Sequence, residues 1–124
     1  MHKVLIVDDV RYMCDMIGNI CKKNNLDVFV AESGDEAIKR LIEHPDIKII
    51  FLDIVMPKMN GIQFLDALSK VEKLKNVPVI VTTANVSEKS VNAVKKYKVS
   101  SFLAKPVRVP QIVELLSKHD LLSK

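Results

Sequence analysis

The apolar run at residues 49–52, which ends in an aspartate, restricts the fold more than any other stretch of the sequence. Its four residues, Ile-Ile-Phe-Leu, include no polar side chain, which is typical of a strand buried on both faces of a sheet. Pro57 follows Asp53 by four positions and cannot extend a strand ladder, so the sequence predicts Asp53 at the carboxyl end of the strand. Because a single aspartate there is also an ordinary turn residue, its meaning depends on the rest of the chain.

Four other short apolar runs alternate with segments of helical periodicity. The predicted strands cover residues 3–7, 28–31, 49–52, 79–82 and 101–104. The predicted helices begin near Val10, Ser33, Asn60, Ser87 and Pro110. We expect the first helix to end at Asn24-Asn25 and the third at Val71, and Ser33 with Glu36 has the spacing of a capping box.

This strict alternation with short connections predicts a parallel sheet with helices on both faces. The 124 residues, 48% of them apolar, suffice for one hydrophobic core and leave no room for a second domain. The sequence therefore predicts a single α/β domain of five strand–helix units over residues 1–124.

Composition excludes several other classes of protein. No apolar run approaches the roughly 20 residues of a membrane helix, and nothing resembles a signal peptide, so we expect a cytoplasmic protein with no membrane partner. The net charge of +4 comes from lysines concentrated at residues 70–75 and 89–98. Only Tyr97 interrupts these lysines, which favours solvated helix faces over direct nucleic-acid binding.

The two cysteines, Cys14 and Cys21, fall seven residues apart in one predicted helix. A helical rise of about 1.5 Å per residue separates their Cα atoms by roughly 10 Å, and a disulfide requires less than about 7 Å. Two cysteines with no nearby histidine are also too few for a structural zinc site. We expect two reduced, partly buried thiols.

Polar residues follow the predicted strands at the edge where parallel strands end. Ordered along the chain, they are Asp8, Asp9, Asp53, Thr83 and Lys105. Since the carboxyl ends of parallel strands meet at one edge of a sheet, we expect these side chains to converge. Three carboxylates that close would repel one another without a cation among them, and oxygen ligands favour Mg²⁺.

This pattern resembles the receiver domain of bacterial two-component response regulators, the CheY-like family, over the whole chain. The residues that carry the resemblance are the pair Asp8-Asp9, the segment Leu52-Asp53-Ile54-Val55-Met56-Pro57 with Asn60-Gly61, the pairs Thr83-Ala84 and Lys105-Pro106, and Phe102. The resemblance implies a flavodoxin-like fold with strand order 2-1-3-4-5.

The resemblance also implies a role for each residue of the site. Asp53 would accept a phosphoryl group from a phosphohistidine of a sensor histidine kinase or a histidine phosphotransfer protein. Mg²⁺ would be held by Asp8, Asp9, Asp53 and the backbone carbonyl of Val55. Lys105 and the Thr83 hydroxyl would bind phosphoryl oxygens, which agrees with the charge stabilisation that phosphoryl transfer needs.

The family's conformational switch would involve Thr83 and the aromatic residue Phe102. Thr82 competes with Thr83 for the hydroxyl role, and neighbouring strand residues face opposite sides of a sheet. The small residue Ala84 after Thr83 matches the family, so we choose Thr83. Phe102 has a second interpretation as an ordinary core aromatic.

The family docks its partners on the face formed by helix four, strand five and helix five. Here that face would carry Val86, Val91, Lys95 and Ala104 around Phe102. The downstream protein target is unknown, and the chain would act as a monomer or a weak dimer through the same face. It would be either a single-domain regulator or the receiver of a longer protein.

Several positions depart from the family pattern. Cys14 stands where an arginine is frequent, Val10 follows the acidic pair, and the glycines usual before strand five are missing. If Lys98 adopts a positive φ, about 1 kcal/mol of strain would loosen the switching segment. Val55 and Asn85 flank the expected phosphoryl site, and the apolar Val55 predicts slow hydrolysis.

Three other classes of protein compete with this interpretation. A haloacid-dehalogenase-like phosphatase would have two aspartates separated by one residue after the first strand, whereas Asp8 and Asp9 are adjacent. A flavodoxin-like cofactor binder would have a phosphate-binding loop there rather than acids. The third is a receiver-like interaction module that switches without phosphorylation. We expect a phosphoacceptor signalling domain, not an enzyme with an external turnover substrate.

Overall fold

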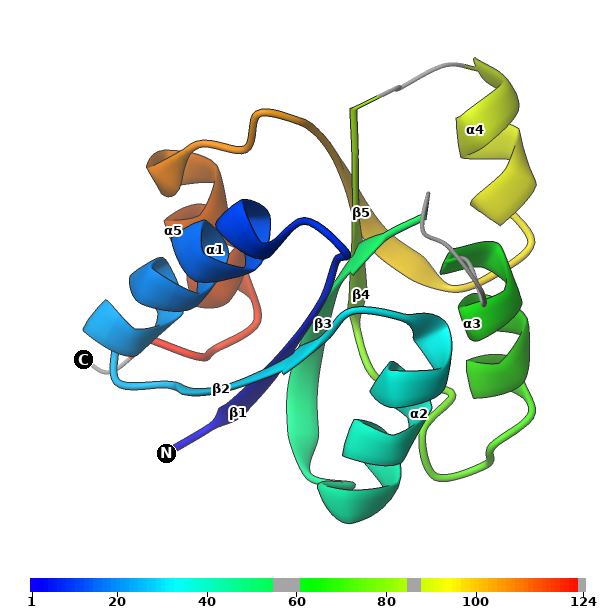
Figure 1. Cartoon of the computed structure of the whole chain (residues 1–124), viewed down its shortest axis with the longest axis horizontal. Helices are drawn as coiled ribbons and strands as arrows, with labels where there is room; N and C mark the ends of the chain where they lie inside the picture. The colour runs from blue at the N-terminus through cyan, green and yellow to red at the C-terminus, as the bar shows by residue number, and fades with distance from the viewer. Residues whose placement is uncertain (55–60, 85–87, 123–124) are drawn as a thin grey trace.

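Five parallel strands form one sheet at the centre of the described part of the chain (Figure 1). The computed structural model describes residues 1–54, 61–84 and 88–122. The strands are β1 (Lys3–Val7), β2 (Asp27–Ala31), β3 (Ile47–Asp53), β4 (Val79–Thr83) and β5 (Val99–Ala104). Their order is β2-β1-β3-β4-β5 and every neighbouring pair is parallel, which confirms the expected fold class.

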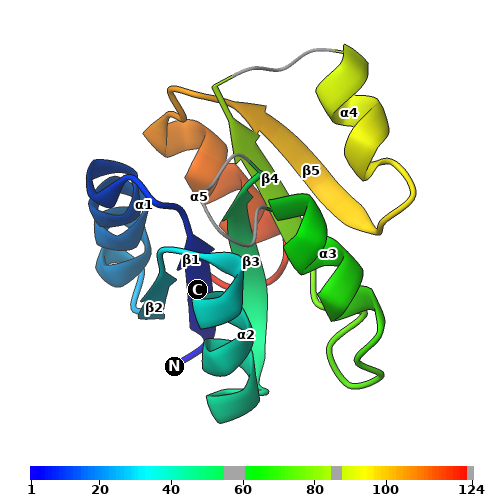
Figure 2. The same ribbon diagram turned by 45° about the vertical axis from the view of Figure 1, so that its right-hand side comes forward.

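Helices cover both faces of this sheet (Figures 1 and 2). They are α1 (Arg11–Lys23), α2 (Gly34–Glu43), α3 (Gly61–Ser69), α4 (Glu88–Val94) and α5 (Val109–Lys118). Helices α1 and α5 pack on one face, and α2, α3 and α4 pack on the other. Because successive strand residues point to opposite faces, each strand contributes to two separate cores.

The central strand β3 has the burial expected of its apolar run. Residues 49–52 are at most 1% exposed, since β1 and β4 flank the strand and helices cover both of its faces. Asp53 is the last residue of the strand and is itself buried, at 5% exposed. The predicted position of Asp53 at the carboxyl end of a buried strand is therefore confirmed.

The start of α2 shows one half of the predicted capping box. The Ser33 hydroxyl accepts a hydrogen bond of 3.2 Å from the Glu36 backbone N–H, which satisfies a free donor of the first turn. The Glu36 carboxylate accepts from the backbone N–H of Glu32 rather than from that of Ser33. The helix begins where the sequence predicts, although the return bond is displaced by one residue.

One prediction about a helix end is wrong, and the condition stated for strain at Lys98 is not met. Helix α3 ends at Ser69, not Val71, because the N–H groups of Lys70 and Val71 bond three residues back and tighten the chain into turns. Lys98 does not adopt a positive φ, since among the described residues only Asn25 and Asp120 do so without being glycine. The expected strain before β5 is therefore absent.

The turn between α4 and β5 explains why Lys98 is unstrained. The Tyr97 N–H donates to the Val94 carbonyl at 3.0 Å, and the Val99 N–H donates to the Tyr97 carbonyl at 2.9 Å. These two bonds reverse the chain without a left-handed residue at position 98. The expected caps Asn60 and Ser87 lie outside the described residues.

Both cysteines are free and buried in α1. Burial raises the pKa of the Cys21 thiol to about 12. Burial likewise raises the pKa of Cys14 to about 12, with a further contribution from the negative charge of Asp8. The prediction of two unpaired thiols is confirmed, and their burial is more complete than expected.

None of the helices in the described ranges is both long and apolar enough to cross a membrane.

Candidate functional site

Three strands bring acidic and basic side chains together at the carboxyl edge of the sheet. Val7 of β1 is in register with Leu52 of β3, so Asp8 lies beside Asp53 one residue further along. Thr83 of β4 is in register with Ala104 of β5, and the Lys105 N–H donates to the Thr83 carbonyl at 2.8 Å. The parallel register therefore joins residues that are far apart in the sequence.

The ammonium of Lys105 bridges the two buried acids. Lys105 Nζ lies 2.8 Å from Asp8 Oδ2 and 3.2 Å from Asp53 Oδ2. The other oxygen of Asp8 accepts a hydrogen bond of 2.9 Å from the Val10 backbone N–H. Asp8 is 2% exposed, so its charge depends on these protein partners rather than on water.

The charges around Lys105 determine its titration. Partial burial of the ammonium acts to lower its pKa. The hydrogen bond to Asp8, together with the negative charges of Asp53 and Asp8, outweighs burial and raises the pKa of Lys105 above its ordinary value. The lysine therefore remains a cation at neutral pH, in contact with both carboxylates.

Asp9 completes a group of three carboxylates. One oxygen from each of Asp8, Asp9 and Asp53 lies within 4.8 Å of the others. Asp9 is exposed, whereas the other two acids are buried, so the group opens to solvent on the side of Asp9. Oxygen atoms of carboxylates are the ligands that Mg²⁺ prefers, and the donor set fits this ion.

Cys14, near the start of α1, contacts the backbone of the acidic loop. The Cys14 thiol donates a hydrogen bond of 3.3 Å to the Asp8 backbone carbonyl. This contact fixes the backbone that carries Asp8. The arginine expected here from the family pattern is thus replaced by a short thiol that supports the acidic loop from inside.

Gly61 holds the start of α3 close to the end of β3. The sequence pair Asn60-Gly61 predicted a helix start but not this close approach. The Gly61 N–H donates to the Ile54 carbonyl at 3.2 Å. A Cβ atom at Gly61 would lie 2.7 Å from the Asp53 carbonyl oxygen and would overlap the Ile54 backbone. Glycine is therefore required by this close approach.

The two threonines at the end of β4 lie on different faces of the sheet. Thr82 is in register with Asp53 and with Leu103, whose side chain packs in the core under α1 and α5. Thr83 follows Val81 on the opposite face, where Phe102 packs against the core under α2, α3 and α4. Thr83 therefore shares its face with Phe102.

Phe102 is half-buried, and the surface around it is hollowed. A groove of about 380 Å³ runs between β5 and α5. It is lined by Ser101, Phe102, Leu103, Gln111, Glu114, Leu115 and Lys118. Val91, Lys95 and Ala104 are exposed. Val55, Asn85 and Val86, which were also expected at the site or its docking face, lie outside the described residues.

The parallel sheet has helices on both faces, and an acidic group bridged by Lys105 lies at its carboxyl end. These features define the class as doubly wound α/β domains with an acidic site, and known proteins of that class match this chain. A family model described as the response regulator receiver domain matches residues 4–117. The chain belongs to the response regulator receiver family.

Individual relatives agree with this assignment. Chemotaxis protein CheY of Listeria monocytogenes is 38% identical over 121 residues, which cover 95% of this chain and 98% of that protein. The transcriptional regulatory protein CpxR homolog of Haemophilus influenzae is 37% identical over 84 residues, which span 68% of this chain but only 35% of that longer protein. The similarity includes both short CheY proteins and a longer regulator.

Solved structures show the same fold. Chemotaxis protein CheY4 of Vibrio cholerae has a TM-score of 0.88 at 25% identity, with 95% of this chain and 98% of that chain covered. The CheX–CheY–BeF3–Mg²⁺ complex of Borrelia burgdorferi has a TM-score of 0.85 at 30% identity, with 94% and 88% covered. These matches support a role in two-component signalling.

Proposed function

We propose that this chain is a phosphorylation-dependent receiver that accepts a phosphoryl group on Asp53. The observation that carries the proposal is the Lys105 ammonium, which lies within 3.2 Å of both Asp53 and Asp8. Two buried carboxylates and a cation at one end of the sheet provide a nucleophile and a charge to stabilise a transferred phosphoryl group. The phosphoryl donor would be a phosphohistidine of a sensor histidine kinase or a histidine phosphotransfer protein.

The proposed reaction moves one phosphoryl group between two protein side chains. A carboxylate oxygen of Asp53 forms a bond to phosphorus, the phosphorus–nitrogen bond to the donor imidazole breaks, and the nitrogen keeps the electron pair. The product on Asp53 is an acyl phosphate, and water later attacks its phosphorus to release inorganic phosphate and restore the carboxylate. Lys105 binds one phosphoryl oxygen and Thr83 another.

The three grouped carboxylates are the proposed Mg²⁺ ligands, together with the backbone carbonyl of Val55. Bound at Asp8, Asp9 and Asp53, Mg²⁺ would offset the negative charge that accumulates on the phosphoryl oxygens. The similar Borrelia burgdorferi complex contains Mg²⁺, which supports this assignment. The contact of Lys105 Nζ with Asp53 Oδ2 meanwhile helps to position this carboxylate as a nucleophile.

A change at Asp53 would reach the partner surface through Thr83 and Phe102. Thr83 lies at the end of β4 on the same face of the sheet as Phe102, which supports the choice of Thr83 over Thr82. A shift of Thr83 toward the phosphoryl group would free space for Phe102, and the α4–β5–α5 face would change shape. An unidentified downstream protein would bind that face, and a second copy of the chain is the alternative occupant.

The phosphoacceptor role is tested by incubating the protein with Mg²⁺ and acetyl phosphate and measuring its intact mass. We expect one added phosphoryl group on the wild type and none on Asp53→Asn, whose circular dichroism should match that of the wild type. An unmodified wild-type protein would contradict the proposal and favour the interaction module that switches without phosphorylation.

Paired threonine variants test the switch. Thr83→Val removes one hydroxyl without changing the side-chain shape, and Thr82→Val is the matched control on the opposite face. We expect the fluorescence of a probe attached near α5 to respond to phosphorylation in Thr82→Val but not in Thr83→Val. The reverse pattern would assign the hydroxyl role to Thr82.

A further inference from the structure

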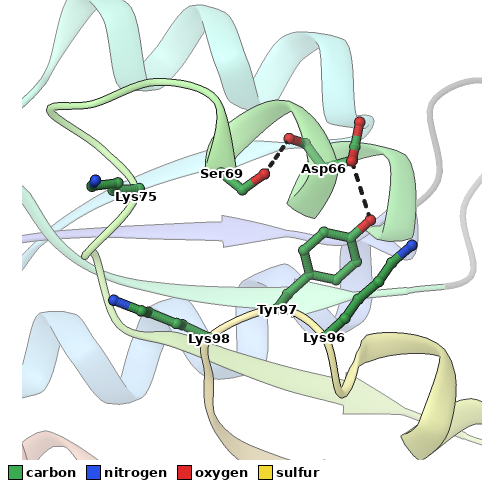
Figure 3. Close-up of a pocket in the computed structure, with 6 residues that line it drawn as sticks. All are labelled: Asp66, Ser69, Lys75, Lys96, Tyr97 and Lys98. Carbon is green, nitrogen blue, oxygen red and sulfur yellow. Dashed lines mark hydrogen bonds between the residues drawn. The ribbon is translucent and has the colours of Figure 1, made fainter.

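A pocket lined by lysines lies among α3, the turn after α4 and the connection that leads to β4 (Figure 3). It has a volume of about 400 Å³. Its lining residues are Asp66, Ser69, Lys75, Lys96, Tyr97 and Lys98. They come from α3, from the connection between α3 and β4, and from the turn between α4 and β5, so the pocket lies where β4 and β5 begin.

Tyr97 and Asp66 form the fixed part of the pocket. The Tyr97 hydroxyl donates to Asp66 Oδ1 at 3.3 Å, which connects the turn after α4 to α3 (Figure 3). Asp66 also pairs with Lys70 at 3.1 Å. The hydrogen bond and charge of Lys70 lower the pKa of Asp66, so this carboxylate is ionised and already neutralised by a cation.

The remaining cations are less compensated. Lys75 pairs with the exposed Glu72 at 3.0 Å. Lys96 Nζ lies 5.3 Å from the centre of the Tyr97 ring, and its charge also acts to lower the pKa of Asp66. Lys98 Nζ donates to the neutral Asn76 side-chain amide oxygen at 3.3 Å. Across the residues that the structure describes, neither Lys96 nor Lys98 takes part in an ion pair. The pocket therefore has an excess of positive charge that faces solvent.

We propose that this pocket, with Lys96 and Lys98 as its principal cations, docks an acidic polypeptide segment of a partner protein. Carboxylates of such a segment would complement the two unpaired ammonium groups, and the chain's net charge of +4 would favour the encounter. The pocket gives the segment a concave surface with a positioned tyrosine rather than a flat array of lysines.

The chemistry of the pocket favours a polypeptide over a nucleic acid. None of the described residues that line it is an arginine, and Lys96 lies over the Tyr97 ring while the Tyr97 hydroxyl donates to Asp66. A base therefore has no free aromatic platform on which to stack, which single-stranded nucleic-acid sites use. The Asp66 carboxylate can accept hydrogen bonds from backbone N–H groups of a peptide.

The proposed docking pocket is a separate site from the phosphoryl site and does not use Asp53. The two sites lie at opposite ends of the parallel strands, because Lys98 precedes the first residue of β5 and Asp53 is the last residue of β3. A partner held here would leave the phosphoryl site open. The proposal goes beyond the phosphoacceptor function and can fail or succeed without it.

Binding of a fluorescein-labelled peptide of twelve alternating glutamates and serines tests the proposal by anisotropy. We expect saturable binding that weakens with added salt, and roughly fivefold weaker binding to Lys96→Gln/Lys98→Gln. The charge-matched control Lys22→Gln/Lys23→Gln removes two exposed lysines at the end of α1 and should change the affinity less than about twofold. Phosphorylation by acetyl phosphate should be the same in both double variants.

Three outcomes would overturn the proposal. The first is no saturable binding of the peptide, and the second is an equal loss of affinity in the control variant, which would indicate attraction by net charge alone. The third is tighter binding of a single-stranded DNA dodecamer with the same dependence on Lys96 and Lys98, which would assign the pocket to nucleic acid.

Discussion

Lys105 Nζ lies 3.2 Å from Asp53 Oδ2 and places a cation directly against the proposed phosphoacceptor. The same nitrogen lies 2.8 Å from Asp8 Oδ2. Both carboxylates are buried, and the positive charge of this side chain offsets their mutual repulsion. Lys105 thus links folding stability to the proposed chemistry.

Lys105→Met should destabilise the protein because it leaves two buried carboxylates without their cation. We expect a loss of about 2 kcal/mol in the free energy of unfolding at neutral pH. This is less than the full cost of breaking a buried ion pair, because the site is partly open to water. Urea denaturation measures this loss. Lys105→Met in the Asp53→Asn background should lose less, and equal losses in the two backgrounds would show that Asp53 and Lys105 are not coupled.

The same pair predicts a pH dependence. The pKa of Lys105 is raised in the folded state, so its stabilising contribution is fully present below the unfolded-state pKa of about 10.4 and is lost as the pH rises through the folded-state pKa. The difference in unfolding free energy between the wild type and Lys105→Met should therefore shrink above about pH 10.4. A difference that grows with pH would contradict the assigned ion pair.

Gly61→Ala should disturb the chain beside Asp53. The new Cβ would lie 2.7 Å from the Asp53 carbonyl oxygen, and we expect a loss of about 2 kcal/mol in stability together with slower phosphorylation. Gly18→Ala is the matched control, since its Cβ would meet only Val28 and Ile6 side-chain atoms at 3.4 and 3.7 Å. This helical substitution should be neutral or stabilising by up to about 1 kcal/mol. Similar losses from the two variants would contradict the structure at Gly61.

The cysteines should react slowly with thiol reagents in the folded protein. Both are buried with pKa values raised to about 12, so few thiolates exist at about pH 8. Ellman's reagent should label both thiols rapidly only in denaturant. Fast labelling without denaturant would show that α1 opens readily.

The raised pKa of Cys21 also predicts a loss of stability in alkali. An unfolded thiol ionises near pH 8.5 to 9 while the folded one stays protonated, so stability is full below that pH and falls as the pH rises toward about 12. At about pH 10.5 this fall amounts to about 2 kcal/mol for one thiol. Cys21→Ala lacks this thiol. Between about pH 8 and about pH 10.5, its free energy of unfolding should therefore fall by correspondingly less than that of the wild type.

Val55 should slow the hydrolysis of the acyl phosphate, because an apolar side chain cannot orient an attacking water. We expect Val55→Asn to hydrolyse the phosphoryl group several-fold faster than the wild type, whereas Val55→Leu should not accelerate it. Loss of the phosphorylated mass with time measures both rates. An unchanged or slower rate in Val55→Asn would exclude this role for Val55.

The sequence was sufficient for the sheet and for the convergence of the acids. The apolar runs of β1, β3 and β4 are buried, and those of the edge strands β2 and β5 are half-buried, so run length and period indicate strand position. The parallel register then brings Asp8, Asp53 and Lys105 together. These features depend on patterns that recur along the chain.

Some local features of the structure depend on individual backbone and side-chain contacts that the sequence pattern does not predict. Lys98 is unstrained because backbone bonds at Tyr97 close the turn, and no composition rule specifies those bonds. The contact of Tyr97 with Asp66 joins residues 31 positions apart on elements that sequence periodicity treats separately. The overlap at Gly61 likewise follows from the path of the backbone after β3.

The most direct test of the central claim identifies the residue that carries the phosphoryl group. The protein is treated with Mg²⁺ and acetyl phosphate, reduced with borohydride, which converts an aspartyl phosphate to homoserine, and sequenced by mass spectrometry. We predict homoserine at position 53 and aspartate at positions 8 and 9. Aspartate at position 53 with homoserine at another position would contradict the account.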